Sequence, residues 1–132
     1  MMKQENNTSK SKINGKILIV DDEPDITESF GLALEDSGFD VDKYNDPAIA
    51  LASFKPNFHN LLILDIKMPK MDGFKLYDKI KKIDKNVKVF FISAFEIDHA
   101  AIRKQYPTLK IENFIPKPIL IPELIKKINE QI

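Results

Sequence analysis

Residues 61–74 read LLILDIKMPKMDGF, and this stretch decides how the rest of the chain is interpreted. It begins with four apolar residues, reaches the carboxylate of Asp65, and then passes through Met-Pro and Asp-Gly turn signals. Unbroken apolar runs are typical of strands that are buried on both faces, as in parallel sheets. The end of a buried strand is a costly place for an unpaired acid. Asp65 therefore requires partners from other parts of the chain.

Strand-like and helix-like segments alternate five times along the sequence. The expected strands are residues 16–20, 39–44, 61–65, 87–93 and 113–118. The expected helices are residues 24–37, 47–56, 73–83, 96–106 and 121–132. Short connections between apolar strands predict an α/β fold, with helices on both faces of a parallel sheet.

The length and composition of the chain suit one compact domain. The chain has 132 residues, 43% of them hydrophobic. It has no cysteine, which excludes disulfides, cysteine–zinc sites and thiol nucleophiles and fits a cytoplasmic location. The polar N-terminus lacks the apolar core of a signal peptide, and no apolar stretch is long enough to span a bilayer. We expect a disordered tail over residues 1–14 and a single domain over 15–132.

Charge is balanced in total but unevenly placed. Residues 1–60 hold 6 Lys and 11 acidic residues, and residues 61–132 hold 13 Lys, 1 Arg and 9 acidic residues. Two differently charged, solvated faces explain this asymmetry. A net charge of zero argues against non-specific nucleic-acid binding as the main function. His59 and His99 have no partner at metal-ligand spacing, so we interpret both as surface residues.

Polar side chains stand at the carboxyl ends of four expected strands. In chain order they are Asp21 and Asp22, Asp65, Ser93 and Lys117. Parallel strands bring their carboxyl ends to one edge of the sheet, and ligands of open α/β sheets bind outside that edge. We therefore expect these five side chains to converge on one site.

The chemistry of this set favours phosphoryl transfer. Three carboxylates held together repel one another, and a divalent cation relieves the repulsion. Oxygen ligands without His or Cys suit Mg²⁺ (or Mn²⁺), which keeps several waters and favours a phosphate as partner. The ammonium of Lys117 and the hydroxyl of Ser93 can both bind phosphoryl oxygens. Acids, cation, lysine and hydroxyl are the parts that phosphoryl transfer requires.

Four motifs carry a family resemblance. They are ILIVDDEPD (17–25), LILDIKMPKMDG (62–73), FFISA (90–94) and FIPKP (114–118). Together, and over residues 15–132, they resemble the response-regulator receiver domains of two-component signalling. The resemblance implies the flavodoxin-like fold of the chemotaxis regulators, with five helices around a doubly wound parallel sheet of strand order 2-1-3-4-5.

The resemblance also implies roles for the site residues. Asp65 is then the phosphoacceptor, which takes a phosphoryl group from the phosphohistidine of a sensor kinase or phosphotransfer protein. Asp21, Asp22 and Asp65 hold Mg²⁺ together with the backbone carbonyl of Lys67, and Lys117 pairs with the phosphoryl group. Such a domain is a signalling phosphoacceptor rather than an enzyme, since it promotes only its own phosphorylation and dephosphorylation.

Two further positions correspond to the switch of the family. Ser93 occupies the position of the switch hydroxyl and Phe114 that of the switch aromatic residue, although core packing also explains an apolar residue in a strand. In the family this switch alters the face formed by the fourth helix, fifth strand and fifth helix, through which an output protein is contacted. The peptide bond after Lys117 is cis in the family.

Two residues beside the site affect the expected lifetime of the phosphorylated form. Lys67 and Phe95 stand two positions after Asp65 and Ser93, where they flank the path of a water that attacks the phospho-aspartate. We expect Phe95 to obstruct that water and Lys67 to hold the phosphoryl charge, so that hydrolysis is slow. The stretch YPTLKIEN (106–113) replaces the Gly-Ala that often precedes the fifth strand in the family.

Other classes of protein are weighed against the receiver domain. A haloacid-dehalogenase-type phosphatase requires a second Asp two residues after the first, where this chain has Lys67. A phosphorylation-independent interaction domain of receiver fold is the main alternative, although such domains usually lack an acid or the lysine. No direct contact with nucleic acid or membrane is expected. The sequence leaves open whether the chain is a single-domain regulator or the receiver of a longer protein.

Overall fold

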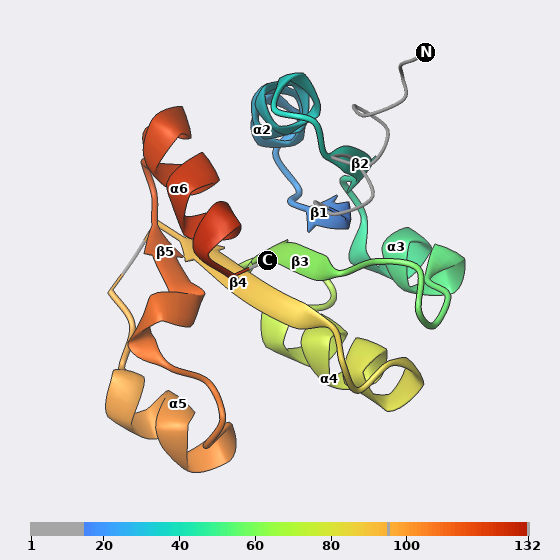
Figure 1. The fold of residues 1–132 in the computed structure, drawn as a ribbon. Helices are drawn as coiled ribbons and strands as arrows, with labels where there is room; N and C mark the ends of the chain where they lie inside the picture. The colour runs from blue at the N-terminus through green and yellow to red at the C-terminus, as the bar shows by residue number, and fades with distance from the viewer. Residues whose placement is uncertain (1–14, 95, 132) are drawn as a thin grey trace.

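A five-stranded parallel sheet forms the centre of the computed structural model, which describes residues 15–94 and 96–131 (Figure 1). The strands are β1 Lys16–Val20, β2 Asp40–Tyr44, β3 Leu61–Asp65, β4 Lys88–Ser93 and β5 Phe114–Pro116. Their order is β2-β1-β3-β4-β5, and each neighbouring pair is parallel. The predicted fold class and strand order are therefore confirmed.

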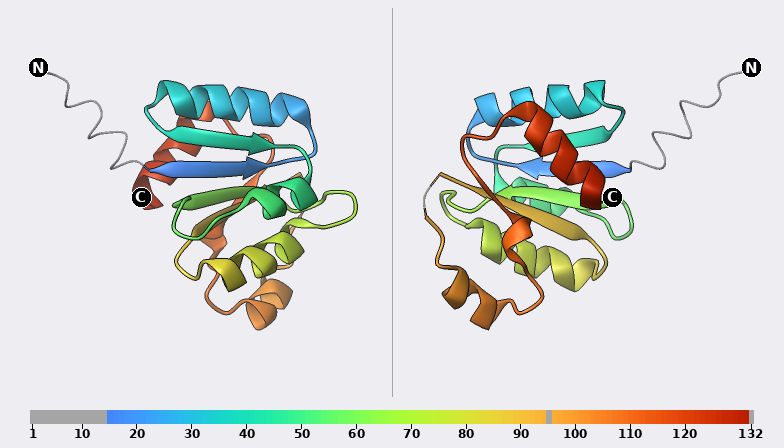
Figure 2. Two further views of the ribbon diagram at one scale, coloured as in Figure 1. Left: turned by 90° about the vertical axis from the view of Figure 1, so that its right-hand side faces the viewer. Right: turned by 60° about the vertical axis from the view of Figure 1, so that its left-hand side comes forward.

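Helices cover both faces of the sheet (Figures 1 and 2). They are α2 Pro24–Asp36, α3 Pro47–Ser53, α4 Gly73–Ile83, α5 His99–Gln105 and α6 Ile121–Gln131, with a short 3-10 turn η1 Ile111–Asn113 before β5. Helices α2 and α6 pack on one face, and α3, α4 and α5 lie on the other. This alternation of sides makes the fold doubly wound.

The strand β3 shows why its sequence is a continuous apolar run. All five of its residues are buried. Leu62 and Leu64 belong to the core beneath α3 and α4, whereas Leu61 and Ile63 belong to the core beneath α2 and α6. Because successive side chains of a strand point to opposite faces, a strand covered on both sides needs apolar residues at every position. Burial on both faces also fixes the position of Asp65 at its end.

Side-chain caps mark the starts of α3 and α4, the helices that follow β2 and β3. Asp46 accepts hydrogen bonds from the backbone N–H groups of Ala48 (2.8 Å) and Ile49 (3.4 Å), and Pro47 occupies the first helical position of α3. Asp72 caps α4 in the same way through Lys75 N–H (2.8 Å). These starts confirm the Asp-Pro and Asp-Gly signals of the sequence.

The helix expected over residues 96–106 is shorter in the structure. Helix α5 covers only His99–Gln105, and residues 96–98 are not helical. Asp98 begins the helix instead, since its carboxylate accepts the backbone N–H of Ala101 (3.1 Å). An N-cap residue has extended backbone dihedrals, which ends the helix on its N-terminal side. The prediction of a helical start at Glu96 was therefore wrong by three residues.

The assignment of His59 to the surface was also wrong. Its side chain is only 4% exposed, and it stacks on the ring of Phe54 with the edge of Phe58 against it. Its Nε2 lies 2.8 Å from Oδ2 of Asp42 on β2. The imidazole is thus a buried group just before β3, and the carboxylate of Asp42 binds it.

We expect His59 to weaken the fold at acidic pH. Burial lowers the pKa of His59 below its ordinary value of 6.5, although Asp42 opposes the shift. Between the two pKa values the unfolded chain binds more protons, so the stability that neutral His59 contributes is lost as pH falls through that window. Relative to His59→Phe, the wild-type unfolding free energy should decrease below pH ~6.5 by at most ~1.4 kcal/mol per pH unit. Urea denaturation of both proteins from pH 8 to 5 measures this difference, and a constant difference would contradict it.

Candidate functional site

The predicted site residues meet at the carboxyl edge of the sheet, where the strand order reverses. Strand β1 lies between β2 and β3. The chain leaving β1 enters α2 on one face, and the chain leaving β3 enters α4 on the other face. This divergence opens the crevice in which open α/β sheets bind ligands. Asp21 and Asp22 follow β1, and Asp65 ends β3, so the three acids flank the crevice.

Three carboxylates cluster in this crevice. Single carboxylate oxygens of Asp21, Asp22 and Asp65 all lie within 4.8 Å of one another. Asp21 and Asp65 are buried, with exposed fractions of 1% and 5%, whereas Asp22 is exposed at the mouth. Two buried acids and one exposed acid give the cluster a fixed floor and an open side.

Lys117 brings a positive charge to the same cluster from the end of β5. Its Nζ lies 3.1 Å from Oδ2 of Asp21 and 3.5 Å from Oδ1 of Asp65. It also donates a hydrogen bond to Oε1 of Glu23 (3.0 Å). The backbone N–H of Lys117 donates to the carbonyl of Ser93 (2.7 Å), and the peptide bond after it is cis, as the family resemblance implies. The lysine is thus held in reach of both buried acids.

Burial and crowding shift the titration of these groups. Burial, with the charge of Asp21 next in importance, raises the pKa of Asp65 to about 7, although Lys117 opposes the shift. Burial also raises the pKa of Asp21, against the opposing N–H of Glu23 and the ammonium of Lys117. Burial alone would lower the pKa of Lys117, but its hydrogen bond to Glu23 and its ion pair with Asp21 outweigh this and raise it. The lysine stays charged, and the acids retain an excess of negative charge that a further cation would relieve.

The cluster fits a hard divalent cation. One oxygen of Asp21, Oδ1, accepts the backbone N–H of Glu23 (2.9 Å). The other, Oδ2, is fully buried and makes no aligned hydrogen bond within the part of the chain that the structure describes, although Lys117 is its ion-pair partner. A buried carboxylate oxygen in this condition, next to two further carboxylates, suits an oxygen-preferring ion such as Mg²⁺.

Gly73 allows the loop after β3 to close against the site. Its N–H donates to the carbonyl of Ile66 (2.8 Å). A Cβ at this position would overlap the backbone carbonyl oxygen of Asp65. The Asp-Gly pair at 72–73 therefore does more than form a turn, because only glycine lets α4 begin this close to the strand that carries Asp65.

Ser93 lies at the carboxyl end of β4 beside the acids, and Phe114 begins the neighbouring strand β5, where it pairs with Phe91. Ser93 ends β4, is 1% exposed, and follows Ile92, which pairs with Asp65 across the strands. Phe114 is buried, stacks on Phe91 with ring centroids 5.4 Å apart, and meets the edge of the His99 ring at 5.5 Å. Core packing of Phe114 is therefore real in this conformation. The contact with His99 on α5 also shows that His99 is not a purely surface residue.

The comparison with protein families agrees with this geometry. A model described as the response regulator receiver domain matches residues 17–129, nearly the whole of the chain. The chain belongs to this family. Receiver domains of two-component response regulators are signalling domains, and the convergence of acids, lysine and hydroxyl at one sheet edge is what this receiver domain presents.

Individual relatives place the receiver domain in proteins of different length. The transcriptional regulatory protein TrcR of Mycobacterium tuberculosis is 29% identical over 114 residues, which cover 86% of this chain and 44% of that protein. The chemotaxis protein CheY of Treponema pallidum is 32% identical over 117 residues, covering 86% of this chain and 79% of CheY. The chain spans 44–48% of the length of the transcriptional regulators that it matches.

A solved structure with a similar fold contains a second protein and ligands. The CheX–CheY–BeF3–Mg²⁺ complex of Borrelia burgdorferi matches with a TM-score of 0.76 and 28% identity, covering 89% of this chain and 88% of that chain. Within residues 15–94 and 96–131, no helix has the length and apolar character needed to cross a membrane.

The two residues expected to modulate the site have different outcomes. Lys67 lies in the loop after β3 with an exposed side chain, two residues beyond Asp65. Phe95 lies outside the described residues, as does the tail predicted over residues 1–14. Their effects on the lifetime of a phosphorylated form stay predictions.

Two residues of the site were not found from the sequence. Glu23 bonds Lys117, and Asn45 bonds the backbone of Asp21 at 2.8 Å. Glu23 follows Asp21 and Asp22 in the sequence, and this position was the only indication of its role. Asn45 lies at the end of β2, and its relevance follows from β2 lying next to β1 in the sheet, which the strand order implied.

Proposed function

We propose that this receiver domain accepts a phosphoryl group on Asp65 and thereby switches a protein-interaction face. The observation that carries the proposal is the cluster of three carboxylates within 4.8 Å, with the Lys117 ammonium 3.5 Å from Oδ1 of Asp65. The donor is the phosphohistidine of a sensor kinase or of a phosphotransfer protein. The solved complex from Borrelia burgdorferi contains BeF3 and Mg²⁺ with its own CheY. Its similarity to this chain supports phosphorylation with Mg²⁺ here as well.

In the transfer, a carboxylate oxygen of Asp65 attacks the phosphorus atom in line with the bond to the histidine nitrogen. The P–N bond breaks as the new P–O bond forms, and the imidazole leaves with the electron pair and is protonated. Lys117 neutralises one phosphoryl oxygen, and the hydroxyl of Ser93 donates to another. Later hydrolysis by water returns Asp65 to the carboxylate. An acyl phosphate is reactive by itself, so the protein contributes mainly position and charge.

Mg²⁺ belongs to this proposal as the resident cation. Asp21, Asp22 and Asp65 would hold it, with the backbone carbonyl of Lys67 as a further ligand. When bound, it offsets the negative charge that the acids and the phosphoryl oxygens bring together. The all-oxygen donor set and the raised pKa of Asp65 are consistent with a site that is completed by a hard cation.

The output is a shift between two conformations of the domain. A phosphoryl oxygen offers Ser93 a hydrogen bond that draws the hydroxyl toward Asp65, and this movement opens space for the ring of Phe114. Helix α5, strand β5 and helix α6 form the face that changes. An output protein binds this face.

Beryllofluoride provides the test of this function, because it mimics an aspartyl phosphate. With Mg²⁺ present, we expect beryllofluoride to shift the amide NMR signals of Asp65, Ser93 and Lys117, and expect no such shifts in Asp65→Asn. Mg²⁺ alone should shift a smaller set around Asp21 and Asp22. Spectra that do not change with either addition would overturn the proposal in favour of a phosphorylation-independent interaction domain.

A further inference from the structure

The loop that carries Asp21 and Asp22 is tied to the neighbouring strand β2 through Asn45. The Nδ2 group of Asn45 donates to the backbone carbonyl of Asp21 (2.8 Å) and to the hydroxyl oxygen of Thr27 (3.0 Å). The hydroxyl of Thr27 in turn donates to the carbonyl of Pro24 (3.1 Å). One side-chain amide thus connects the end of β1 with the first turn of α2.

These bonds fix both ends of the acidic loop. Before the loop, the N–H of Asp21 donates to the carbonyl of Tyr44 (3.1 Å), which extends the pairing of β1 with β2 by one residue. Its carbonyl is then held by Asn45, so both backbone polar groups of Asp21 are bound to β2 or the residue after it. After the loop, Thr27 is 1% exposed and anchors the helix. Asp22 lies between these two anchors and has no burial of its own to hold it.

We infer that Asn45 is a positioning residue for the metal site, acting on the direction of the Asp21 and Asp22 carboxylates through the backbone of their loop. The inference rests on the proposed function, in which these acids bind Mg²⁺. Carboxylates aimed in advance bind a cation without a further cost for ordering the loop. Residues that orient metal ligands without touching the metal typically change affinity by 10- to 100-fold when removed.

A purely structural role for Asn45 makes a different prediction. If the amide only stabilised the fold, its removal would lower stability without a selective effect on the acids. Asn45 is itself exposed, so truncation leaves no cavity in the core. The effects on metal affinity and on stability can therefore be measured separately.

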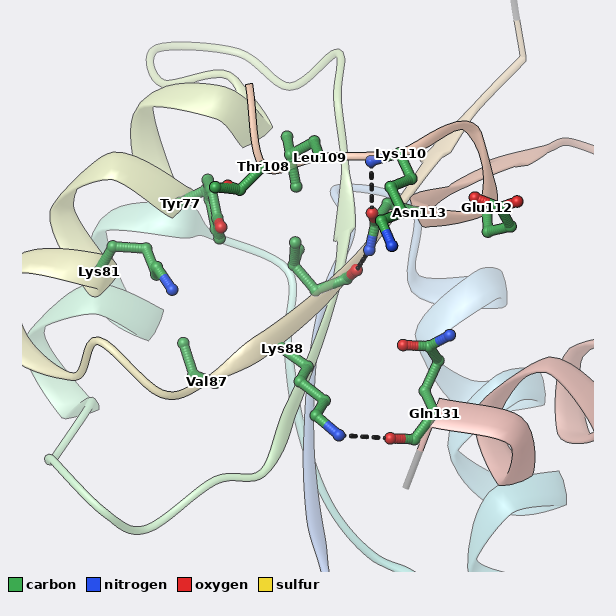
Figure 3. Close-up of a pocket in the computed structure, with 11 residues that line it drawn as sticks. Tyr77, Lys81, Val87, Lys88, Thr108, Leu109, Lys110, Glu112, Asn113 and Gln131 are labelled. Carbon is green, nitrogen blue, oxygen red and sulfur yellow. Dashed lines mark hydrogen bonds between the residues drawn. The ribbon is translucent and has the colours of Figure 1, made fainter. Parts of the chain in front are cut away.

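Asn113 offers a matched control at the opposite edge of the sheet. Its Nδ2 donates to the carbonyl of Val89 (2.8 Å), and its Oδ1 accepts the backbone N–H of Lys110 (2.8 Å). Figure 3 shows both bonds among the residues that line a pocket. The lining of this pocket includes Tyr77 and Lys88 and none of the site acids. Alanine at Asn113 removes two hydrogen bonds of a side-chain amide, as alanine at Asn45 does, but far from Asp21.

The experiment compares Mg²⁺ affinity, measured by calorimetry, in wild type, Asn45→Ala and Asn113→Ala. We expect the dissociation constant to rise about tenfold in Asn45→Ala and less than twofold in Asn113→Ala. Equal changes in the two variants, or an unchanged constant in Asn45→Ala, would overturn the inference alone. A wild-type protein that binds no Mg²⁺ would instead overturn the proposed function, and the inference with it.

A second readout needs no metal. The N–H of Glu23 donates to Oδ1 of Asp21 at 2.9 Å, so its hydrogen exchange reports on the direction of that carboxylate. We expect faster exchange at Glu23 in metal-free Asn45→Ala and unchanged exchange in Asn113→Ala.

Variants of Thr27 test the same network through Mg²⁺ affinity. Thr27→Val should raise the dissociation constant of Mg²⁺, as Asn45→Ala does, and Thr27→Ser, which keeps the hydroxyl, should have a constant close to that of the wild type. Exchange and affinity that do not respond to these changes would assign Asn45 and Thr27 to the fold only.

Discussion

Asp65→Asn should reduce phospholabelling of the protein by a small acyl phosphate donor in the presence of Mg²⁺ to the background level. The amide that replaces the carboxylate has no nucleophilic oxygen of comparable strength, and the buried end of β3 places no other group at the same point. Label on the wild type should be lost on treatment with hydroxylamine, which cleaves acyl phosphates. The measurement is incorporation of labelled phosphate followed by gel separation, with and without hydroxylamine.

The nearest competitors for the phosphoryl group are the other acids of the cluster. Asp21 is buried and paired with Lys117, Asp22 is exposed, and both follow β1 rather than end β3. Asp40→Asn is the matched control, because Asp40 is an exposed aspartate at the opposite end of β2. It should keep wild-type labelling. Hydroxylamine-sensitive label that persists in Asp65→Asn would show that another carboxylate is the acceptor.

The central part of the site could be predicted because the fold itself brings it together. Once strands of parallel type are recognised, their carboxyl ends share one edge, and Asp65 and Lys117 must approach each other even though 52 positions separate them in the chain. The register of β3 against β4 then decides which residue of β4 lies beside Asp65. In this chain Asp65 pairs with Ile92, and Ser93 follows.

What the sequence did not reveal depends on packing rather than on pattern. His59 follows a Phe in a polar loop, and nothing in its spacing indicates that Phe54 and Asp42 enclose its ring. Helix α5 begins late because Asp98 caps it, a choice that competes with the apolar spacing from residue 96 onward. Such choices follow from hydrogen bonds between segments, which periodicity does not record.

Burial and the neighbouring carboxylates lead us to expect that the carboxylate of Asp65 weakens the metal-free fold. Asp65→Asn should raise the unfolding free energy in EDTA at pH 8 by roughly 2–4 kcal/mol, since its pKa of about 7 in the folded protein lies well above the ordinary 3.8. Between these values the folded state binds more protons than the unfolded chain. Wild-type stability from this group therefore falls as pH rises through that window, and the advantage of Asp65→Asn grows from pH 4 to 7. Urea denaturation at several pH values measures it.

Asp84 is the control for this prediction, because it is a buried carboxylate outside the cluster of acids. Its substitution separates the effect of burial on stability from the effect of neighbouring carboxylates. It is also buried, at 7% exposed, but its two oxygens accept the backbone N–H groups of Asn57 (2.9 Å) and Asn86 (3.0 Å). Asp84→Asn leaves one of these two backbone N–H groups with a poorer acceptor and should lower the unfolding free energy by about 1–2 kcal/mol.

Millimolar Mg²⁺ should reduce the difference in unfolding free energy between wild type and Asp65→Asn, because Mg²⁺ binding stabilises the native wild type more than the variant. It should leave the destabilisation by Asp84→Asn unchanged. If Asp65→Asn were as destabilising as Asp84→Asn, the carboxylate of Asp65 would be satisfied without a metal. The acids would then form a structural ion pair with Lys117 and would not be a cation-binding site.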